Sequence, residues 1–162
     1  MGLDMFLIRK TVFTPMKDNI GIEKEEVVKE KQKHLGGLSG FGIYPNKVCG
    51  ILEEVGYWRK DFQIHNWFVN NVQEGNDDCK QHTVHIEDLM ELKQICNEVL
   101  NDHSKKDDLL PLSDYDEDYF IGLKHTIEII NEIISDETEI EKHRSEHIGL
   151  GCFHLYYYQS SW

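Results

Sequence analysis

The sequence predicts an α+β fold, with a small mixed or antiparallel sheet that includes the terminal strands and packs against about three helices. Aromatic and β-branched residues form strand-like runs near both ends of the chain, at residues 3–13 and 153–159. Between these runs, apolar residues repeat at the three- and four-residue spacing of amphipathic helices. Since strands stand at both ends, we expect the two terminal strands to belong to one sheet.

The first third of the chain predicts one strand and a polar arm. The strand at 3–13 ends at Thr14-Pro15. Residues 23–34 are nearly all polar and compatible with a helix, which indicates either a surface helix or a mobile arm. The glycine-rich stretch 36–42 predicts turns. We therefore expect a single domain over 1–162, with a polar arm at 14–42.

The centre of the chain predicts a helix that buries one face. Its apolar positions follow the helical spacing i, i+4, i+7, i+11 and i+14. These positions are Trp58, Phe62, His65, Val69 and Val72. A turn at 75–78 and a short strand at 79–85 follow.

Two further helices are predicted in the C-terminal half. Glu87 and Asp88 favour a helix start, because acidic side chains are stabilised at the positive end of the helix dipole. A polar loop at 101–108 separates this helix from the next, which begins at the capping-box pattern Asp114-x-x-Glu117. The first helix has the apolar stripe Leu89, Leu92, Cys96, Val99 and Leu100, and the second has Phe120, Leu123, Ile127, Ile130 and Ile134.

The composition predicts an acidic intracellular protein that does not contact nucleic acid directly. The 162 residues include 17 basic and 30 acidic side chains, for a net charge of −13. Residues 1–50 carry +2 and residues 51–162 carry −15. Such a field repels phosphates and attracts basic surfaces. Because no apolar run approaches a membrane span and the first residues do not resemble a signal peptide, we expect neither membrane insertion nor secretion, and reduced cysteines.

Several stretches together resemble a family of small acidic proteins from phages and prophages that has no assigned activity. They cover most of residues 1–12 and 46–162. They are Met1-Gly2-Leu3-Asp4-Met5, Gly56-Tyr57-Trp58-Arg59-Lys60, Ile64-His65-Asn66-Trp67-Phe68-Val69, Asp77-Asp78-Cys79, Asp114-Tyr115-Asp116-Glu117 and Tyr157-Tyr158-Gln159-Ser160-Ser161-Trp162. The chain departs from this family at the His-rich segment 81–85 and in an added stretch at 137–154.

Some proteins of this size, charge and setting are anti-CRISPR proteins of Gram-positive prophages, of the streptococcal type. The resemblance therefore implies an inhibitor that acts in the host cytoplasm. It would bind a basic CRISPR-associated nuclease and block its loading or cutting of DNA. No phosphate-binding loop, HExxH or GxSxG motif is present. We accordingly expect that the chain is not an enzyme.

Zinc is the cofactor that the residue pattern suggests. The densest cluster of suitable ligands is His143, His147, Cys152 and His154. Two histidines four apart share one helix face, and Cys152 and His154 share one strand face. Thiolate and imidazole suit a closed tetrahedral zinc site, which would be structural. The alternative interpretation is a solvated helix end with unrelated histidines.

An alternative site lies around His65 and Cys79. Cys79, His82 and His85 could bind metal, alone or with His65, although a strand would point His82 away from the other two. His65 could instead be a buried histidine with one satisfied hydrogen bond. A third interpretation joins His65 and Cys79 with 159–161 in a polar pocket, where a small enzyme or ligand-binding protein would hold a nucleotide-like molecule.

The partner-binding surface is predicted in an acidic run. Its residues are Asp107, Asp108, Asp114, Tyr115, Asp116, Glu117 and Asp118. Spaced carboxylates with interleaved aromatic side chains could imitate nucleic-acid phosphates and occupy a basic channel. The alternative interpretation is a solvated loop and helix start.

Overall fold

The computed structural model describes residues 2–15, 25–112, 117–146 and 150–162. The described chain forms two compact units. Unit 1 comprises 1–9, 53–136 and 155–162, and unit 2 comprises 10–52 and 137–154. The predicted polar arm at 14–42 falls in unit 2, where part of it forms helix α1 (Glu25–Leu35) and a 3-10 helix (Gly36–Phe41). The fold is α+β, as the sequence predicts.

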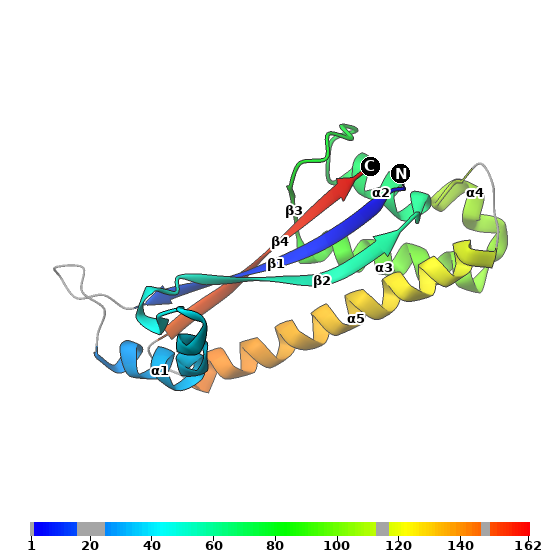
Figure 1. Ribbon diagram of the computed structural model, residues 1–162. Coiled ribbons are helices and arrows are strands. Elements are labelled where there is room, and N and C mark those ends of the chain that lie inside the picture. Colours follow the sequence, from blue (N-terminus) through cyan, green and yellow to red (C-terminus); the bar gives the residue numbers. More distant parts are fainter. Residues whose placement is uncertain (1, 16–24, 113–116, 147–149) are drawn as a thin grey trace. The chain divides into compact units, whose positions relative to one another are not determined.

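Four strands form one antiparallel sheet in the order β2-β1-β4-β3. The strands are β1 (Asp4–Pro15), β2 (Gly50–Arg59), β3 (His82–Val84) and β4 (Leu150–Ser161). Figure 1 shows β1 running opposite to β2 and to β4. The prediction that the terminal strands share a sheet is confirmed, because β1 and β4 are neighbours. The register of β3 on β4 pairs Thr83 with Tyr157.

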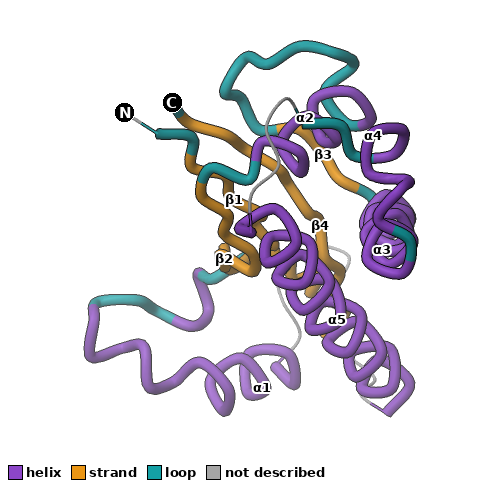
Figure 2. The backbone as a smooth tube through the Cα atoms, turned by 90° about the vertical axis from the view of Figure 1, so that its right-hand side faces the viewer, coloured by secondary structure: helices purple, strands orange, loops and turns teal. Residues whose placement is uncertain are grey.

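The sheet buries one face in unit 1. Alternate residues at the start of β1 (Met5 and Leu7, with Leu3 just before the strand) and of β4 (Tyr156, Tyr158 and Ser160) are buried. This period of two is the signature of a strand with one face against a core. Figure 2 shows α2 (Phe62–Asn71), α3 (Ile86–Asn101) and α5 (Glu117–Glu146) on one side of the sheet.

The helices complete the core with the stripes that the sequence predicts for α3 and α5. In α3, Leu89, Leu92, Cys96 and Val99 are buried. In α5, Leu123 and Ile130 are buried, and Phe120, Ile127 and Ile134 pack against the core while partly exposed. The segment 101–108, predicted as a polar loop, contains the 3-10 helix His103–Lys105 and the short helix α4 (Lys106–Leu109).

The prediction of one helix from Trp58 to Val72 is wrong. Trp58 belongs to β2, and α2 begins only at Phe62. The apparent spacing joins residues on either side of a turn at Lys60, whose φ is 62°. The buried face of α2 consists of Gln63, Ile64, His65, Trp67 and Phe68, whereas Phe62 is exposed.

The position of Trp58 in a strand has a physical reason. Its indole Nε1 donates a hydrogen bond of 2.9 Å to Thr126 Oγ1 on α5. Gly56, two residues earlier, lies so close to α5 that a Cβ atom would come within 2.9 Å of Ile129. Tertiary packing of the sheet on α5 therefore outweighs the local helical spacing.

No helix in the described part of the chain is long and apolar enough to cross a membrane.

Candidate functional site

The chain turns sharply from β2 into α2 at Lys60 and Asp61. Lys60 has a left-handed φ of 62°, and its amide donates to the Leu3 carbonyl at 2.9 Å. Asp61 has φ −80° and ψ 70°, and the Phe62 amide donates to the Lys60 carbonyl at 2.9 Å. These values define an inverse γ-turn. The turn brings Arg59, Lys60 and the first turn of α2 to one place.

A cavity of about 1070 Å³ opens at this turn. It is large enough for a small organic ligand. Two cations, two carboxylates, two amides and an apolar wall surround it. The lining residues are Arg59, Lys60, Asp61, Phe62, Gln63, Asn66, Pro111, Leu112, Asp118 and Tyr119.

Hydrogen bonds fix one wall of the cavity. Gln63 is buried, and its Nε2 lies 3.3 Å from Asp61 Oδ1 and 3.5 Å from the Tyr119 carbonyl oxygen. The Tyr119 hydroxyl donates to the Leu110 carbonyl at 2.9 Å. On α5, a Cβ atom at Gly122 would overlap the Asp61 carboxylate. The missing side chain at Gly122 lets this carboxylate lie against α5.

His65 lies on the other flank of α2 in a buried polar network. Its Nδ1 is 2.7 Å from the Tyr158 hydroxyl, and its Nε2 is 3.2 Å from Asp77 Oδ2. An ionised carboxylate only accepts hydrogen bonds, so Nε2 carries the proton and Nδ1 of the neutral ring accepts from Tyr158. Burial, with the nearby Asp77 charge, raises the pKa of Tyr158 above its usual value.

Asp77 gathers the C-terminal residues around His65. Besides His65, its carboxylate accepts from Ser160 Oγ at 3.4 Å and from Trp162 Nε1 at 3.2 Å. The Trp162 ring meets His65 edge-on, with centroids 5.5 Å apart. The Tyr158 ring is fully buried and stacks on Phe68 at 4.1 Å. In this arrangement the network joins the end of β4 to α2.

The structure brings together part of the pocket proposed around His65 and Cys79. His65 and Ser160 meet at Asp77, and Gln159 Nε2 donates to the Cys79 carbonyl at 3.1 Å. Cys79 is half-buried and has a left-handed φ of 56°. The partner of His65 is thus Asp77, and Cys79 contributes through its backbone.

Sequence reasoning missed the roles of Asp77, Tyr158 and the Arg59-Lys60 pair. All four residues fall in the stretches that carry the family resemblance, but Asp77 was assigned to a turn and Arg59 and Lys60 to a helix interior. One signal could have found the β2–α2 boundary. Asp61 precedes the apolar run and is a residue type that favours the N-cap position.

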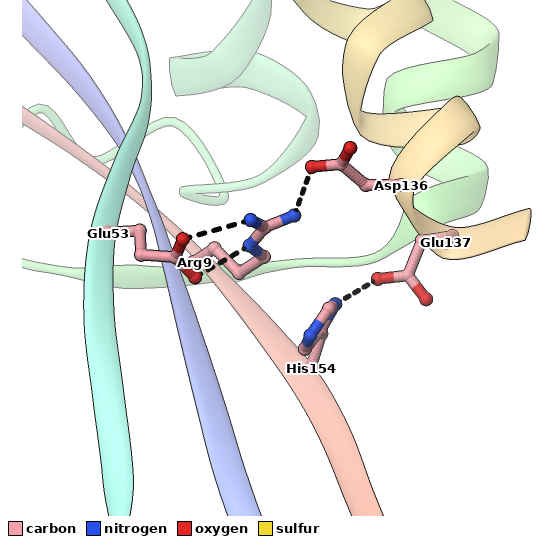
Figure 3. A network of polar contacts seen from close by, with 5 residues as sticks. All are labelled: Arg9, Glu53, Asp136, Glu137 and His154. Carbon is pink, nitrogen blue, oxygen red and sulfur yellow. Dashed lines mark hydrogen bonds and ion pairs between the residues drawn. The ribbon is translucent and has the colours of Figure 1, made fainter. Parts of the chain in front are cut away.

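Most of the first proposed zinc cluster lies outside the described residues. His147 falls in 147–149, and the side chains of His143 and Cys152 are not described. The fourth ligand, His154, has its Nδ1 2.6 Å from Glu137 Oε1, within unit 2 (Figure 3).

Two residues of the second proposed cluster take part in local hydrogen bonds. His82 Nε2 is 2.9 Å from Asp78 Oδ1, and the His85 amide donates to Asp88 Oδ2 at 2.7 Å at the start of α3. Hydrogen bonds from Lys80 and His82 hold the pKa of Asp78 far below its usual range. Within the described ranges, no group of three or more His, Cys, Asp or Glu residues is placed to hold a metal ion.

The acidic run is described only in part. Asp107, Asp108 and Asp118 are exposed. Asp114, Tyr115 and Asp116 lie outside the described residues, as does the side chain of Glu117. Lys106, which directly precedes the run, has its Nζ 3.5 Å from Asp107 Oδ1 and so pairs with the first of these carboxylates.

A second polar network, in unit 1, ties strands to α5 (Figure 3). Arg9 of β1 makes two hydrogen bonds of 3.1 Å to the Glu53 carboxylate and one of 2.6 Å to Asp136 Oδ2. Burial alone would lower the pKa of Arg9, but its bonds to Glu53 and Asp136 raise it above the usual value. This network is structural in character, because the Arg9 side chain is only 12% exposed.

Comparison of the chain with protein-family models, with curated proteins and with solved structures gives no match.

Proposed function

We propose that this chain is a phage-encoded inhibitor that acts by stoichiometric binding to a basic host protein. The proposed target is an RNA-guided nuclease whose loading or cutting of DNA is blocked. The observation that carries the proposal is a stripe of carboxylates along α3, exposed except for the half-buried Glu98, that continues into the predicted acidic run. Its members, called here the acidic stripe, are Glu87, Glu91, Glu98, Asp102, Asp107 and Asp108.

The geometry of α3 supports a binding role for the stripe. Glu87, Glu91 and Glu98 recur at helical spacing on the solvent face, and Met90 beside them is 54% exposed. An exposed apolar side chain among charges is typical of an interface. A partner with a basic nucleic-acid channel would match this surface.

Local contacts stabilise the charged form of two carboxylates of the stripe, and Glu98 also pairs with Lys105 at 3.2 Å. Glu98 and Asp102 lie at the C-terminal end of α3, whose last turn holds no basic residue. The helix dipole by itself disfavours negative charge at that end. Local hydrogen bonds, from Gln94 to Glu98 and from Ser104 to Asp102, lower the pKa of both carboxyls and so keep them ionised.

The test compares two charge reversals of equal size. In the first variant, Glu87→Lys, Glu91→Lys and Asp108→Lys change the acidic stripe. The matched control is Glu128→Lys, Glu132→Lys and Glu139→Lys at exposed positions of α5, outside the acidic run. We expect salt-sensitive binding of the wild-type chain to a purified RNA-guided nuclease near one-to-one, lost only in the stripe variant. Equal loss in both variants, or retention in both, would contradict the stripe as the binding surface.

A second candidate function is a small enzyme or ligand-binding protein for a nucleotide-like molecule around His65 and Cys79. The chain of hydrogen bonds from Tyr158 through His65 to Asp77 favours it, since such an arrangement can orient and hold a proton. Stoichiometry separates the two candidates. An inhibitor acts near equal molar amounts of its target, whereas an enzyme acts far below that ratio.

We further propose a structural zinc at His143, His147, Cys152 and His154. The protein purified without a metal column should contain one zinc per chain by elemental analysis. Removal of the metal by a chelator should lower the melting temperature, because a metal bound to the native state stabilises it. The proposal would be contradicted by a protein that contains no metal and whose melting temperature is unchanged when the chelator is added.

A further inference from the structure

The cavity at the β2–α2 turn carries two neighbouring cations in a chain of net charge −13. The Arg59 side chain is 65% exposed, and its ion pair with Asp4 is long, at 3.8 Å between Nε and Oδ1. Within the described residues, the structure records no ion pair for Lys60. Both cations are therefore available to an anionic group of a ligand.

The turn holds the two cations in place at a conformational cost. A non-glycine residue with positive φ is uncommon, and Lys60 adopts φ 62°. Strained backbone of this kind persists where the surrounding structure enforces it, often at ligand sites. Here the bond from the Lys60 amide to Leu3 and the γ-turn at Asp61 enforce it.

The remaining cavity walls suit a planar group with hydrogen-bonding edges. Phe62 is 37% exposed and lines the cavity while its ring lies 6.1 Å from that of Trp162, and Pro111 and Leu112 add apolar surface. Asn66 and Asp118 are exposed on the lining and can accept from amino groups. Cations, an apolar wall and a carboxylate thus surround one space.

We propose that this cavity binds a nucleoside monophosphate. Arg59 and Lys60 would hold the phosphate, Phe62 and the Pro111-Leu112 wall would contact the base, and Asp118 with Asn66 would accept from its amino groups. The site differs from the acidic stripe and from the His65 network. It stands independently of the proposed inhibitor function, and the test uses the purified chain alone.

The first experiment is calorimetric titration of the full chain with AMP, GMP, CMP and UMP, with the matching nucleosides and with inorganic phosphate. We expect at least one nucleotide to bind at least about 10-fold more tightly than its nucleoside and than phosphate, because the cations and the apolar wall act together. The proposal is overturned if no nucleotide binds more tightly than both its nucleoside and inorganic phosphate, or if nothing binds.

The second experiment removes the two cations. The double variant Arg59→Gln with Lys60→Asn keeps a residue that tolerates positive φ at position 60. Its nucleotide affinity should fall by about 10-fold or more, since charge-assisted hydrogen bonds are lost. The control with the same charge change, Lys93→Gln with Lys124→Gln, should keep the wild-type affinity. An equal fall in both pairs would show a general charge effect and overturn the assignment.

A third variant covers the case in which the double variant at Arg59 and Lys60 does not fold. Asn66→Glu puts a carboxylate on the cavity wall at an exposed position of α2. It should weaken nucleotide binding at least about 10-fold, because the longer side chain occupies space assigned to the base and adds negative charge to the cavity, with an unchanged melting temperature. Wild-type affinity in this variant would place the ligand elsewhere and overturn the proposal.

Discussion

At the residue scale, Gly122 decides how closely the β2–α2 turn approaches α5. Ordinarily a glycine inside a helix destabilises it by about 1 kcal/mol relative to alanine. At this position, however, a Cβ atom would overlap the Asp61 carboxylate. Asp61 in turn accepts from the buried Gln63 amide at 3.3 Å. The fold therefore tolerates a poor helix former to keep this contact.

A double-mutant cycle tests this account of Gly122. Gly122→Ala alone should lower the free energy of unfolding by about 1–3 kcal/mol, because the steric cost exceeds the gain in helix propensity. In an Asp61→Ala background, the same substitution should stabilise by about 1 kcal/mol. Urea unfolding followed by circular dichroism measures both. The same sign of effect in both backgrounds would exclude the Asp61 contact as the cause.

The buried hydroxyl of Tyr158 is a second decisive group at the residue scale. It donates to His65 at 2.7 Å, and burial raises its pKa. A group whose pKa is higher in the folded state than in the unfolded state contributes stability below its unfolded pKa, near 10 for tyrosine, and loses it as the pH rises. Burial also raises the pKa of Cys96 to about 12, so its contribution fades in the same direction, above about pH 9.

Tyr158→Phe should change both the level and the pH dependence of stability. At pH 7 the variant should lose about 1–3 kcal/mol, since Nδ1 of His65 is left buried without its donor. Between pH 9 and 11 its stability should fall less steeply than that of the wild type, by up to about 1.4 kcal/mol per pH unit. Part of the pH dependence of stability should remain in the variant, because Cys96 also contributes to it. Parallel curves from urea unfolding over this range would contradict the assignment.

At the scale of elements, Arg9 links β1, β2 and α5 within unit 1. Its two bonds to Glu53 and one to Asp136 use the planar fork of the guanidinium. The two carboxylates are partly exposed, at 41% and 48%, so water can solvate them when the cation is removed. We therefore expect the geometry of the three hydrogen bonds, more than the charge of Arg9, to hold β1, β2 and α5 in alignment.

Substitutions at Arg9 separate charge from geometry. Arg9→Met should lower the free energy of unfolding by about 1–3 kcal/mol through the lost charged hydrogen bonds. Arg9→Lys keeps the charge but not the fork, and it should recover less than half of that loss. Chemical denaturation of the two variants gives the comparison. Full recovery by lysine would mean that charge alone accounts for the contribution.

At the scale of the whole molecule, the charge is strongly acidic and uneven along the sequence. Residues 51–162 hold −15, and residues 1–50 hold +2. Excess charge of one sign destabilises a compact chain by self-repulsion. The same field favours encounter with a basic partner, which supports the proposed function.

Salt should therefore stabilise the free protein. Between about 10 and 300 mM NaCl the Debye length falls severalfold, which screens repulsion between the exposed carboxylates. The urea midpoint should rise over this range. The Arg9 network, with a side chain only 12% exposed, should be screened less. A midpoint that falls with salt would mean that surface ion pairs outweigh the repulsion.

The sequence predicted those elements whose pattern agrees with their tertiary role. The stripe of α3 and the acidic start at Glu87 and Asp88 match the structure, because Asp88 accepts from the His85 amide and the apolar face is buried. The prediction of one central helix failed at Trp58. Trp58 of β2 and the apolar residues of α2 follow the spacing of a helix although a turn separates them. Periodicity cannot detect such a turn when the residue that makes it, Lys60, is not a usual left-handed residue.

The candidate site was predictable only in its residue types. His65, Cys79 and Ser160 were singled out, but Asp77, which joins His65 to Ser160, was not. Asp77 and Ser160 are 83 positions apart. Nothing in a local pattern shows which of several acidic turn residues lies opposite a buried histidine.

By itself, the sequence determined the α+β class, the stripes of α3 and α5, the membership of both terminal strands in one sheet and the acidic field. These properties follow from local periodicity, composition and the need to bury apolar faces. The tertiary structure alone decided the β2–α2 turn, the close approach at Gly122, the His65 network and the cavity at Arg59 and Lys60. Each of these depends on groups brought together from distant positions, as with the 93 positions that separate His65 from Tyr158.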